Sequence, residues 1–317
     1  MVDPQSNGPQ WERAVLEKVA LSAIQEQRSA RRWSVFFKSA FLLYLVVLLV
    51  IGMGWLSKHD ALPGNHTALV EINGIISSNS QASADKVVSG LQAAFKDKNT
   101  QGVVIRINSP GGSPVQAGYI NDEIKRLRAK YPAIPLYAVV EDVCASGGYY
   151  IAAAADRIYV DKASIIGSIG VLMDGFGFTG TMEKLGVERR LLAAGENKGF
   201  LDPFSPIQDQ QKAHAETMLG DIHRQFIEVE RQGRGKRLKE APDMFSGLLW
   251  VGQKSIDLGL ADALGSLDSV ARDVIKAENI VDFTQQENIA ERFARRFGAA
   301  SVETLMKLGG FGNFNFR

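Results

Sequence analysis

The amino-acid sequence predicts an α/β domain with a largely parallel sheet, extended by further helices and preceded by one transmembrane helix. From residue 68 onward, short apolar runs rich in β-branched residues alternate with helical stretches, a pattern typical of strands joined by crossover helices. Before that region, residues 35–56 form an almost unbroken apolar run. The first observation predicts the fold class, and the second predicts a membrane anchor.

The alternating pattern sets the order of elements in the predicted domain. The strand GVVIRIN runs into the turn SPGGS, and the strand PLYAVV runs into EDVCASGG, after which a short helix begins. Because parallel strands end at one edge of a sheet, the two turns are expected to share the edge where sites are built. The predicted strands cover residues 68–76, 102–108, 135–140 and 157–161. The predicted helices cover residues 84–97, 115–131, 147–155, 209–231 and 266–278.

The run VFFKSAFLLYLVVLLVIGMGWL at residues 35–56 is long enough to cross a bilayer, since its 22 residues extend about 33 Å as a helix. The alternative of a buried core helix is weaker, because such a helix seldom lacks a polar face over this length. A cleaved signal peptide also fits poorly, because the region before the run is long and no small-x-small site follows before Lys58. The basic residues on the amino-terminal side are Arg28, Arg31, Arg32 and Lys38.

These charges predict the orientation of the anchor. The positive-inside rule places residues 1–34 in the cytoplasm and the rest of the chain across the membrane, which in a bacterium is the periplasmic or outer side of the inner membrane. Residues 11–27 are expected to form an amphipathic helix that either lies on the membrane surface or pairs with another copy. The predicted division is a cytoplasmic segment 1–34, a transmembrane helix 35–57, a linker 58–67, the α/β domain 68–280 and a tail 281–317.

Composition excludes several classes of function. The net charge of +1 over 317 residues gives no reason to expect a nucleic-acid partner. Cys144 is the only cysteine, so the chain has no internal disulfide and no cysteine-based metal site, and Cys144 is expected to be a small buried residue. Neither an H-E-x-x-H motif nor a clustered His/Asp ligand set is present, and no metal or other cofactor is expected.

Ser146, in EDVCASGGYYIAAAA, is the candidate nucleophile. It follows a predicted strand and opens a predicted helix, where free N–H groups and the helix dipole stabilise developing negative charge. Gly147 and Gly148 leave room for a substrate backbone. The G-x-S-x-G motif of ordinary hydrolases is absent, because Cys144 stands two positions before the serine. The alternative, that Ser146 is only a helix cap, stays open at this point.

The segment NSPGGS, residues 108–113, is the candidate oxyanion hole. A Pro-Gly-Gly turn directly after a strand frees backbone N–H groups from the sheet and can direct them into a shared cavity. An ordinary surface turn is the alternative, and this composition suits it equally well.

A histidine base is not expected beside Ser146. Two of the four histidines fall in the predicted linker, and the other two lie on a predicted amphipathic helix, where solvent-facing histidine is ordinary. The four are His59, His66, His214 and His223.

Lys198, in AAGENKGFLDPFSP, is the candidate base instead. A lysine that acts as a base must be neutral, and because a solvated ammonium has a pKa of about 10.4, it needs apolar walls and an acceptor that orients it. Phe200 and Phe204 adjoin Lys198 and could supply walls, and Ser168 in IIGSIGVL could supply the acceptor. The alternative is an ordinary solvated lysine in a loop.

The three stretches NSPGGS, VCASGGYYIAAAADRIYVDKASIIGSIGV and GENKGFLDPFSP, in this order, resemble the signal peptide peptidase A family of membrane-anchored Ser-Lys proteases. The similarity covers roughly residues 68–275, and the 52-residue spacing between serine and lysine and the amino-terminal anchor both match the short, single-domain form of the family. The resemblance implies a Clp-protease/crotonase-like fold. The family pattern offers little for residues 1–34 or for the tail beyond about 280.

The resemblance also implies a role for each candidate residue. Ser146 matches the family's nucleophile and Lys198 its general base, while Ser168 matches the serine that orients the lysine. Gly112 matches a donor of the oxyanion hole, and the Gly147 amide is expected to be the second donor. A Ser-Lys dyad needs no metal, because the lysine takes the proton of the serine and water hydrolyses the acyl-enzyme.

The expected substrates and partners follow from the same resemblance. Family members hydrolyse remnant signal peptides and other hydrophobic segments near the membrane and form rings, so a ring-shaped homo-oligomer is expected here. The stretch ASIIGSIGVL, residues 163–172, is expected to act as a strand against which an extended peptide pairs. Residues 35–57 are expected to contact membrane lipid.

Two rival interpretations remain. Acyl-CoA enzymes of the crotonase-like fold use a similar oxyanion turn, but they would not require Ser146 and Lys198 together or an outward-facing domain. A non-enzymatic scaffold would bind peptides or membrane proteins without cutting them, and the intact dyad argues against it.

Overall fold

The computed structural model describes residues 10–52 and 64–285, which belong to two separate units. The first contains helix α1 (Gln10–Gly52), and the second is an α/β unit. The predictions for residues 1–9, 53–63 and 286–317, which include much of the predicted linker and tail, concern residues outside the described ranges.

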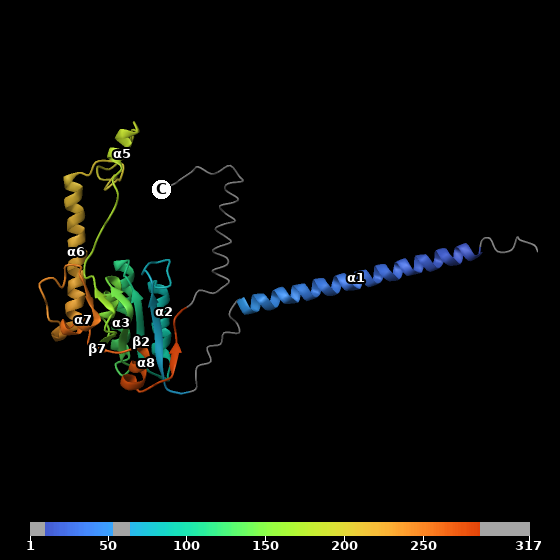
Figure 1. Ribbon diagram of the computed structural model, residues 1–317, viewed down its shortest axis with the longest axis horizontal. Coiled ribbons are helices and arrows are strands. Elements are labelled where there is room, and N and C mark those ends of the chain that lie inside the picture. The colour runs from blue at the N-terminus through green and yellow to red at the C-terminus, as the bar shows by residue number, and fades with distance from the viewer. Residues whose placement is uncertain (1–9, 53–63, 286–317) are drawn as a thin grey trace, which may run out of the picture. The chain divides into compact units, whose positions relative to one another are not determined.

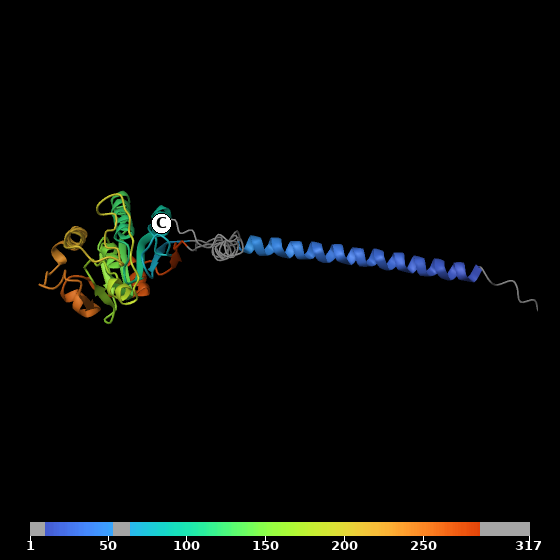
Figure 2. The same cartoon turned by 90° about the horizontal axis from the view of Figure 1, so that it is seen from above.

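Helix α1 is continuous over 43 residues, or about 65 Å, and Figure 2 shows it as one straight helix. It is the described helix that is long and apolar enough to span a membrane. The expected amphipathic segment 11–27 is therefore not a separate short helix, because no glycine or proline interrupts the chain between it and the apolar run.

Within the described residues, eight strands of the α/β unit form one sheet. The spatial order is β6-β5-β3-β2-β1-β8, with β4 beside the first part of β3 and β7 beside β4. Every pairing is parallel except the one between β5 and β6. The predicted α/β class is therefore confirmed. The strands are β1 (His66–Asn73), β2 (Thr100–Ser109), β3 (Leu136–Ala145), β4 (Arg157–Val160), β5 (Ile165–Gly167), β6 (Leu249–Val251), β7 (Ala263–Leu264) and β8 (Ile280–Asp282).

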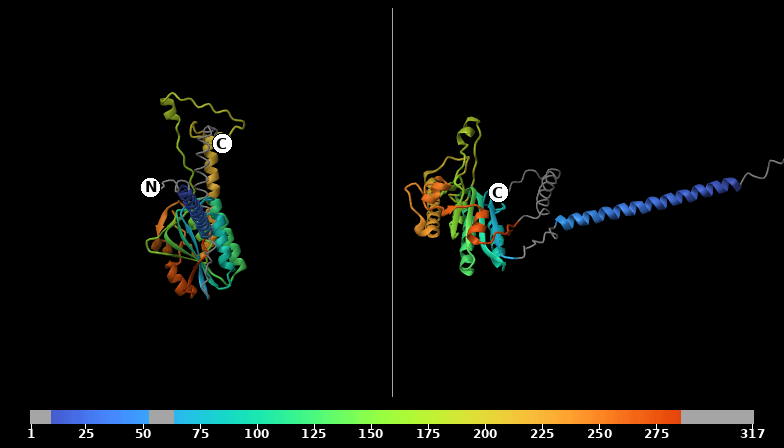
Figure 3. Two further views of the ribbon diagram at one scale, coloured as in Figure 1. Left: turned by 90° about the vertical axis from the view of Figure 1, so that its right-hand side faces the viewer. Right: turned by 60° about the horizontal axis from the view of Figure 1, so that its bottom comes forward.

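Helices cover both faces of this sheet. Figure 3 shows α2 and α3 side by side against one face, and the C-terminal elements on the other. Helix α6 packs on α4, and Figure 1 shows α5 beyond the amino-terminal end of α6, away from the sheet. The helices are α2 (Ala84–Lys96), α3 (Pro114–Lys130), α4 (Gly147–Ala152), α5 (Thr179–Lys184), α6 (Asp209–Arg234), η1 (Gly235–Arg237), α7 (Gly252–Asp257), α8 (Leu267–Ser269) and a π-helical turn, η2 (Val270–Ile275).

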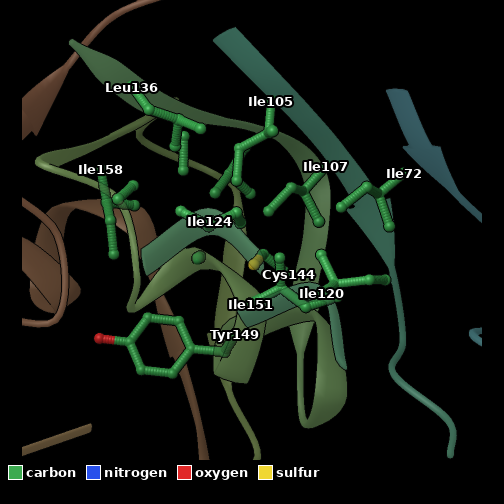
Figure 4. Close-up of a cluster of buried hydrophobic side chains, with 14 of the residues drawn as sticks. Ile72, Ile105, Ile107, Ile120, Ile124, Leu136, Cys144, Tyr149, Ile151 and Ile158 are labelled. Carbon is green, nitrogen blue, oxygen red and sulfur yellow. The ribbon is translucent and has the colours of Figure 1, made fainter. Parts of the chain in front are cut away.

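The core lies between the sheet and the helices α2, α3 and α4. The central strands are apolar on both faces, as strands of a covered parallel sheet are expected to be. Figure 4 shows Ile105 and Ile107 of β2 together with Ile120 and Ile124 of α3. The small second core of Val104, Val139, Tyr159 and Val270 lies on the opposite face.

The structure differs from the sequence prediction at several boundaries. His66, expected in the linker, is the first residue of β1 and is fully buried, with its ring stacked on Phe283 at 5.9 Å. Strand β3 continues to Ala145, so the segment expected as a turn before Ser146 is strand. The helix expected over residues 266–278 is the short α8 followed by the π-helical turn. These boundaries depend on contacts with distant segments, which a local pattern does not contain.

Candidate active site

Ser146 lies between the end of β3 and the start of α4, with a backbone conformation that is rare for a residue with a side chain. Its φ is 50° and its ψ is −123°, and its hydroxyl makes no capping hydrogen bond to α4. The helix-cap alternative therefore does not explain the serine. Backbone strain of this kind costs on the order of 1–3 kcal/mol and is concentrated at functional sites. Its backbone is held in place by a 2.8 Å hydrogen bond from its N–H to the Gly167 carbonyl.

The glycine turn after β2 lies directly against Ser146. A Cβ atom on Gly111 would be 2.7 Å from the Cβ of Ser146 and 2.8 Å from the Gly147 nitrogen, so only glycine fits there. Gly111 and Gly112 have φ values of 101° and 148°, which side-chain-bearing residues rarely adopt. The carboxyl edge of the sheet thus brings the two predicted turns together, as the parallel topology requires.

The Gly112 N–H does not take part in the hydrogen bonds to the Ile76 segment. The hydrogen bonds of the bridge to Ile76 are made by the Gly111 carbonyl and the Ser113 N–H, which leaves the Gly112 N–H on the other side. A Cβ on Gly147 would lie 3.4 Å from the Gly112 nitrogen, so the two glycine backbones are adjacent. These are the two residues whose amides were predicted to form an oxyanion hole.

Ser168 lines the same cavity as Ser146, and it also has a positive φ, of 51°. It directly follows β5, which pairs with the last residues of β3, so the sheet itself holds the two serines near one edge. The Ser168 N–H donates to the Leu248 carbonyl at 2.8 Å.

The cavity has a volume of about 550 Å³ and is lined by residues from several distant segments. Helix α6 contributes Ile222, Gln225 and Phe226, and the ring of Phe226 packs on Tyr150 of α4 at 5.2 Å. His223, also on α6, has its Nε2 3.2 Å from the Ile169 carbonyl, which fixes the segment after Ser168. Sequence reasoning missed these α6 residues, because nothing local in α6 indicates which face meets the site.

Lys198 is not among the residues that line this cavity. It is exposed, and its loop is folded by short turns, with the Lys198 N–H bonded to the Gly195 carbonyl at 3.1 Å. The expected apolar walls lie elsewhere: the ring of Phe204 stacks on Phe178 at 5.5 Å, and the ring of Phe200 meets His214 at 5.8 Å. Within the described chain, Ser146, Ser168, Gly112 and Gly147 come together, and Lys198 does not join them.

The predicted peptide-pairing strand is also shorter than expected. Of residues 163–172, only Ile165–Gly167 form a strand, and both edges of this strand are occupied, by β3 and by β6. The cavity is instead lined by the residues that follow, Gly170, Val171 and Leu172. A peptide that pairs here must use this part of the segment.

Cys144 and the acidic residues do not form a metal site in the described part of the chain, where no group of three His, Cys, Asp or Glu side chains converges. Cys144 is fully buried, and burial raises the pKa of its thiol far above the ordinary value. It packs in the main hydrophobic cluster (Figure 4).

Comparisons with known proteins identify the class of this domain. The model of "Peptidase family S49" matches residues 128–281. A protein named putative signal peptide peptidase SppA from Enterococcus faecium is 28% identical over 224 residues, 68% of this chain and 64% of that protein. Protease 4 from Haemophilus influenzae is 28% identical over 255 residues, 79% of this chain and 40% of its own length.

A protein from Brucella melitensis named Na(+)/H(+) antiporter NhaA is 45% identical over 182 residues, 57% of this chain and 25% of that protein. Three quarters of that protein lie outside the matched stretch, so its name describes a much longer molecule. The chain spans less than two thirds of the length of each of these relatives.

Proposed function

Because the chain belongs to the signal peptide peptidase A family, peptidase family S49, we propose that it is a membrane-anchored serine endopeptidase with Ser146 as its nucleophile. The observation that carries the proposal is the conformation of Ser146. Its hydroxyl caps no helix, its backbone is strained, and it lines a cavity beside the Gly112 turn.

The reaction proposed for this geometry is acyl transfer to Ser146. Lys198 takes the hydroxyl proton while the serine oxygen attacks the peptide carbonyl, and the Gly112 and Gly147 amides hold the oxyanion. The leaving amine takes a proton from Lys198, and water then hydrolyses the acyl-enzyme. Ser168 orients the lysine amine.

Lys198 reaches Ser146, in this proposal, from a neighbouring copy in a ring-shaped homo-oligomer. The segment that carries Lys198 exposes large apolar side chains, as a surface covered by another copy would. They include Leu172 (79% exposed), Phe176 (80%), Leu185 (72%), Leu192 (97%) and Ile207 (64%).

The substrates proposed are hydrophobic peptides, including remnant signal peptides. The part of the cavity formed by Ala117, Tyr150, Ile222 and Phe226 is lined by apolar and aromatic side chains, which suits small or apolar substrate residues. Helix α1 would anchor the enzyme in the bacterial inner membrane with its amino terminus in the cytoplasm, so that substrate and enzyme meet at the periplasmic surface. A Clp-protease/crotonase-like fold accords with the parallel sheet and the oxyanion turn.

The test is labelling of the full chain in detergent with a serine-reactive fluorophosphonate, followed by mapping of the adduct. Label on Ser146 that is lost in Lys198→Ala but kept in Lys184→Ala, an exposed lysine of α5, supports an activated dyad. A folded, assembled protein that takes no label at Ser146 would contradict the proposal and favour a peptide-binding scaffold.

A mixing experiment tests the shared site. Ser146→Ala and Lys198→Ala chains are each expected to be inactive, and co-assembly of the two should restore up to roughly a quarter of the wild-type activity, because some neighbours then combine an intact serine with an intact lysine. No recovery in mixed assemblies would mean that each chain uses its own lysine.

A further inference from the structure

Glu230 lies on the buried face of α6 and is completely inaccessible to solvent. Neither of its carboxyl oxygens has a hydrogen-bond partner in the described part of the chain. One turn earlier on the same face, Phe226 packs on Tyr150 of α4, and one turn later Arg234 is also buried. Glu230 therefore lies in the α6 face that covers α4, the helix that begins directly after Ser146.

Arg234 does not neutralise Glu230 by direct pairing. Its Nε donates to the Gly259 carbonyl and its Nη1 to Asp262, both at 2.8 Å. Asp262 also pairs with Arg237 at 3.3 Å. The remaining Nη2 of Arg234 is buried without a hydrogen-bond partner among the described residues. Arg234 is thus held by the segment before β7 rather than by the glutamate one turn away.

The other titratable groups that face Glu230 belong to β3 and α4, the two elements on either side of Ser146. They are the Cys144 thiol at the end of β3 and the hydroxyls of Tyr149 and Tyr150 in α4. Tyr149 donates its hydroxyl to the Leu260 carbonyl at 2.7 Å, so it does not donate to Glu230. Figure 4 shows Cys144 and Tyr149 within the cluster of buried hydrophobic side chains.

A charged carboxylate is strongly disfavoured in such a place, because it has lost its water and gained no donor. Burial accordingly raises the pKa of Glu230 well above the ordinary value, although the charge of Arg234 acts in the opposite direction.

We propose that Glu230 is a positioning residue, held as a neutral carboxylic acid, that allows α6 to pack on α4 and so fixes the turn that carries Ser146. The role in catalysis rests on the proposed peptidase function. Ionisation of Glu230 would place a charge between α6 and α4 and loosen this packing. The close approach of Gly233 to Ala153 shows how tightly the two helices meet, since a Cβ on Gly233 would be 2.1 Å from the Ala153 carbonyl oxygen.

The sign of the pH effect on stability follows from linkage. The folded protein keeps the Glu230 proton above the pH at which the unfolded chain loses it, near 4.3. The contribution of Glu230 to the free energy of unfolding is therefore fully present below that pH. It falls as the pH rises, until the folded protein loses the proton as well. Between these two pH values, the folding constant of the wild type falls about tenfold per pH unit relative to that of a variant that cannot ionise at this position.

The experiment compares urea unfolding of the full chain in detergent for wild type, Glu230→Gln and Glu228→Gln, which changes an exposed glutamate on the same helix. As the pH rises above about 4.3, the ratio of the wild-type to the Glu230→Gln folding constant should fall, by up to about tenfold per pH unit, until the folded protein also loses the proton. Glu228→Gln should follow wild type. If Glu230→Gln does not fold, the apolar Glu230→Leu takes its place. A ratio that stays constant with pH would overturn the proposal.

Amide hydrogen exchange tests the positioning role without reference to activity. The reporters are the N–H groups of Tyr150 and Ala153, which bond to the carbonyls of Ser146 and Tyr149 at 3.0 and 2.9 Å. At alkaline pH their exchange should be faster in wild type than in Glu230→Gln, while Glu228→Gln matches wild type. Equal exchange at every pH would refute positioning. Absence of fluorophosphonate label in wild type would contradict only the peptidase proposal, because urea unfolding and hydrogen exchange test the positioning role of Glu230 without reference to activity.

Discussion

Replacement by alanine should raise the free energy of unfolding at one glycine of α6, Gly220, and lower it at another, Gly233. Replacement of glycine by alanine inside a helix normally stabilises it by up to about 1 kcal/mol. Gly220 follows that rule in the structure, because a Cβ there would have its nearest neighbour, Arg224 Nη1, at 3.7 Å. We therefore expect Gly220→Ala to raise the free energy of unfolding by about 0.5–1 kcal/mol.

Gly233→Ala, in contrast, should lower the free energy of unfolding. The Cβ of Gly233→Ala would lie 2.1 Å from the Ala153 oxygen and 2.8 Å from its carbon, more than 1 Å short of ordinary contact with the oxygen. Neither partner is a flexible side-chain end, so α6 has to move away from α4. Overpacking of this kind costs about 1–3 kcal/mol, which exceeds the gain in helix propensity, and we expect a net loss of about 1–2 kcal/mol.

Urea unfolding of the two variants, followed by circular dichroism, measures both effects in one protein. A loss of 1–2 kcal/mol corresponds to a melting temperature lower by about 2–8 °C for a domain of this size. Because Phe226 and Tyr150 line the cavity, Gly233→Ala should also slow fluorophosphonate labelling of Ser146, while Gly220→Ala should not. If both variants were more stable than wild type, the inferred contact between the helices would be wrong.

Three further predictions concern the site and its support. Ser146→Gly should be more stable than Ser146→Ala by about 1 kcal/mol, while both variants lack activity. Glycine adopts a φ of 50° without strain, and this gain outweighs the greater entropy of its unfolded chain. Equal stability of the two variants in urea would contradict the inferred strain at Ser146. Gly111→Ala should reduce the labelling rate at Ser146 at least about 100-fold, since its Cβ would displace the serine or the neighbouring amide, and near-normal labelling would speak against the turn as an oxyanion hole. Burial opposes ionisation of Asp262, but the hydrogen bond from Arg234 and other contacts outweigh burial and lower the pKa of Asp262. The stabilisation by Asp262 is therefore present above about pH 4 and is lost at lower pH. Asp262→Asn should reduce the loss of stability in acid, measured by urea unfolding, and an unchanged dependence on pH would contradict this prediction.

The elements around the site could be predicted because their signals are local. The apolar runs before Ser109 and Ser146 read as buried strands, and each is followed by small residues that suit a turn. Parallel pairing then places the two turns at one edge, and the structure brings Gly111 against Ser146. The amphipathic pattern of α6 was also sufficient to predict a helix there, with bounds within a few residues.

The parts that the sequence could not predict depend on contacts over long separations. Nothing near His66 indicates that it begins a strand, because its burial depends on Thr100 and Phe283. The two-residue β7 and the three-residue β6 and β8 exist only through their partners in the sheet. Similarly, the motif around Lys198 gives its position in the chain but not its position in space, and the folded chain leaves it exposed.

The pairing of β1 with β8 makes the α/β unit easy to attach to other proteins. The chain enters the unit at His66, and it leaves next to the same strand, where the Glu71 N–H bonds to Thr284 Oγ1 at 2.9 Å. A unit whose entry and exit share one edge can be appended to, or inserted into, a larger polypeptide with little disturbance to its interior. The Brucella melitensis protein, of which 25% matches this chain, is a longer polypeptide that contains a similar stretch.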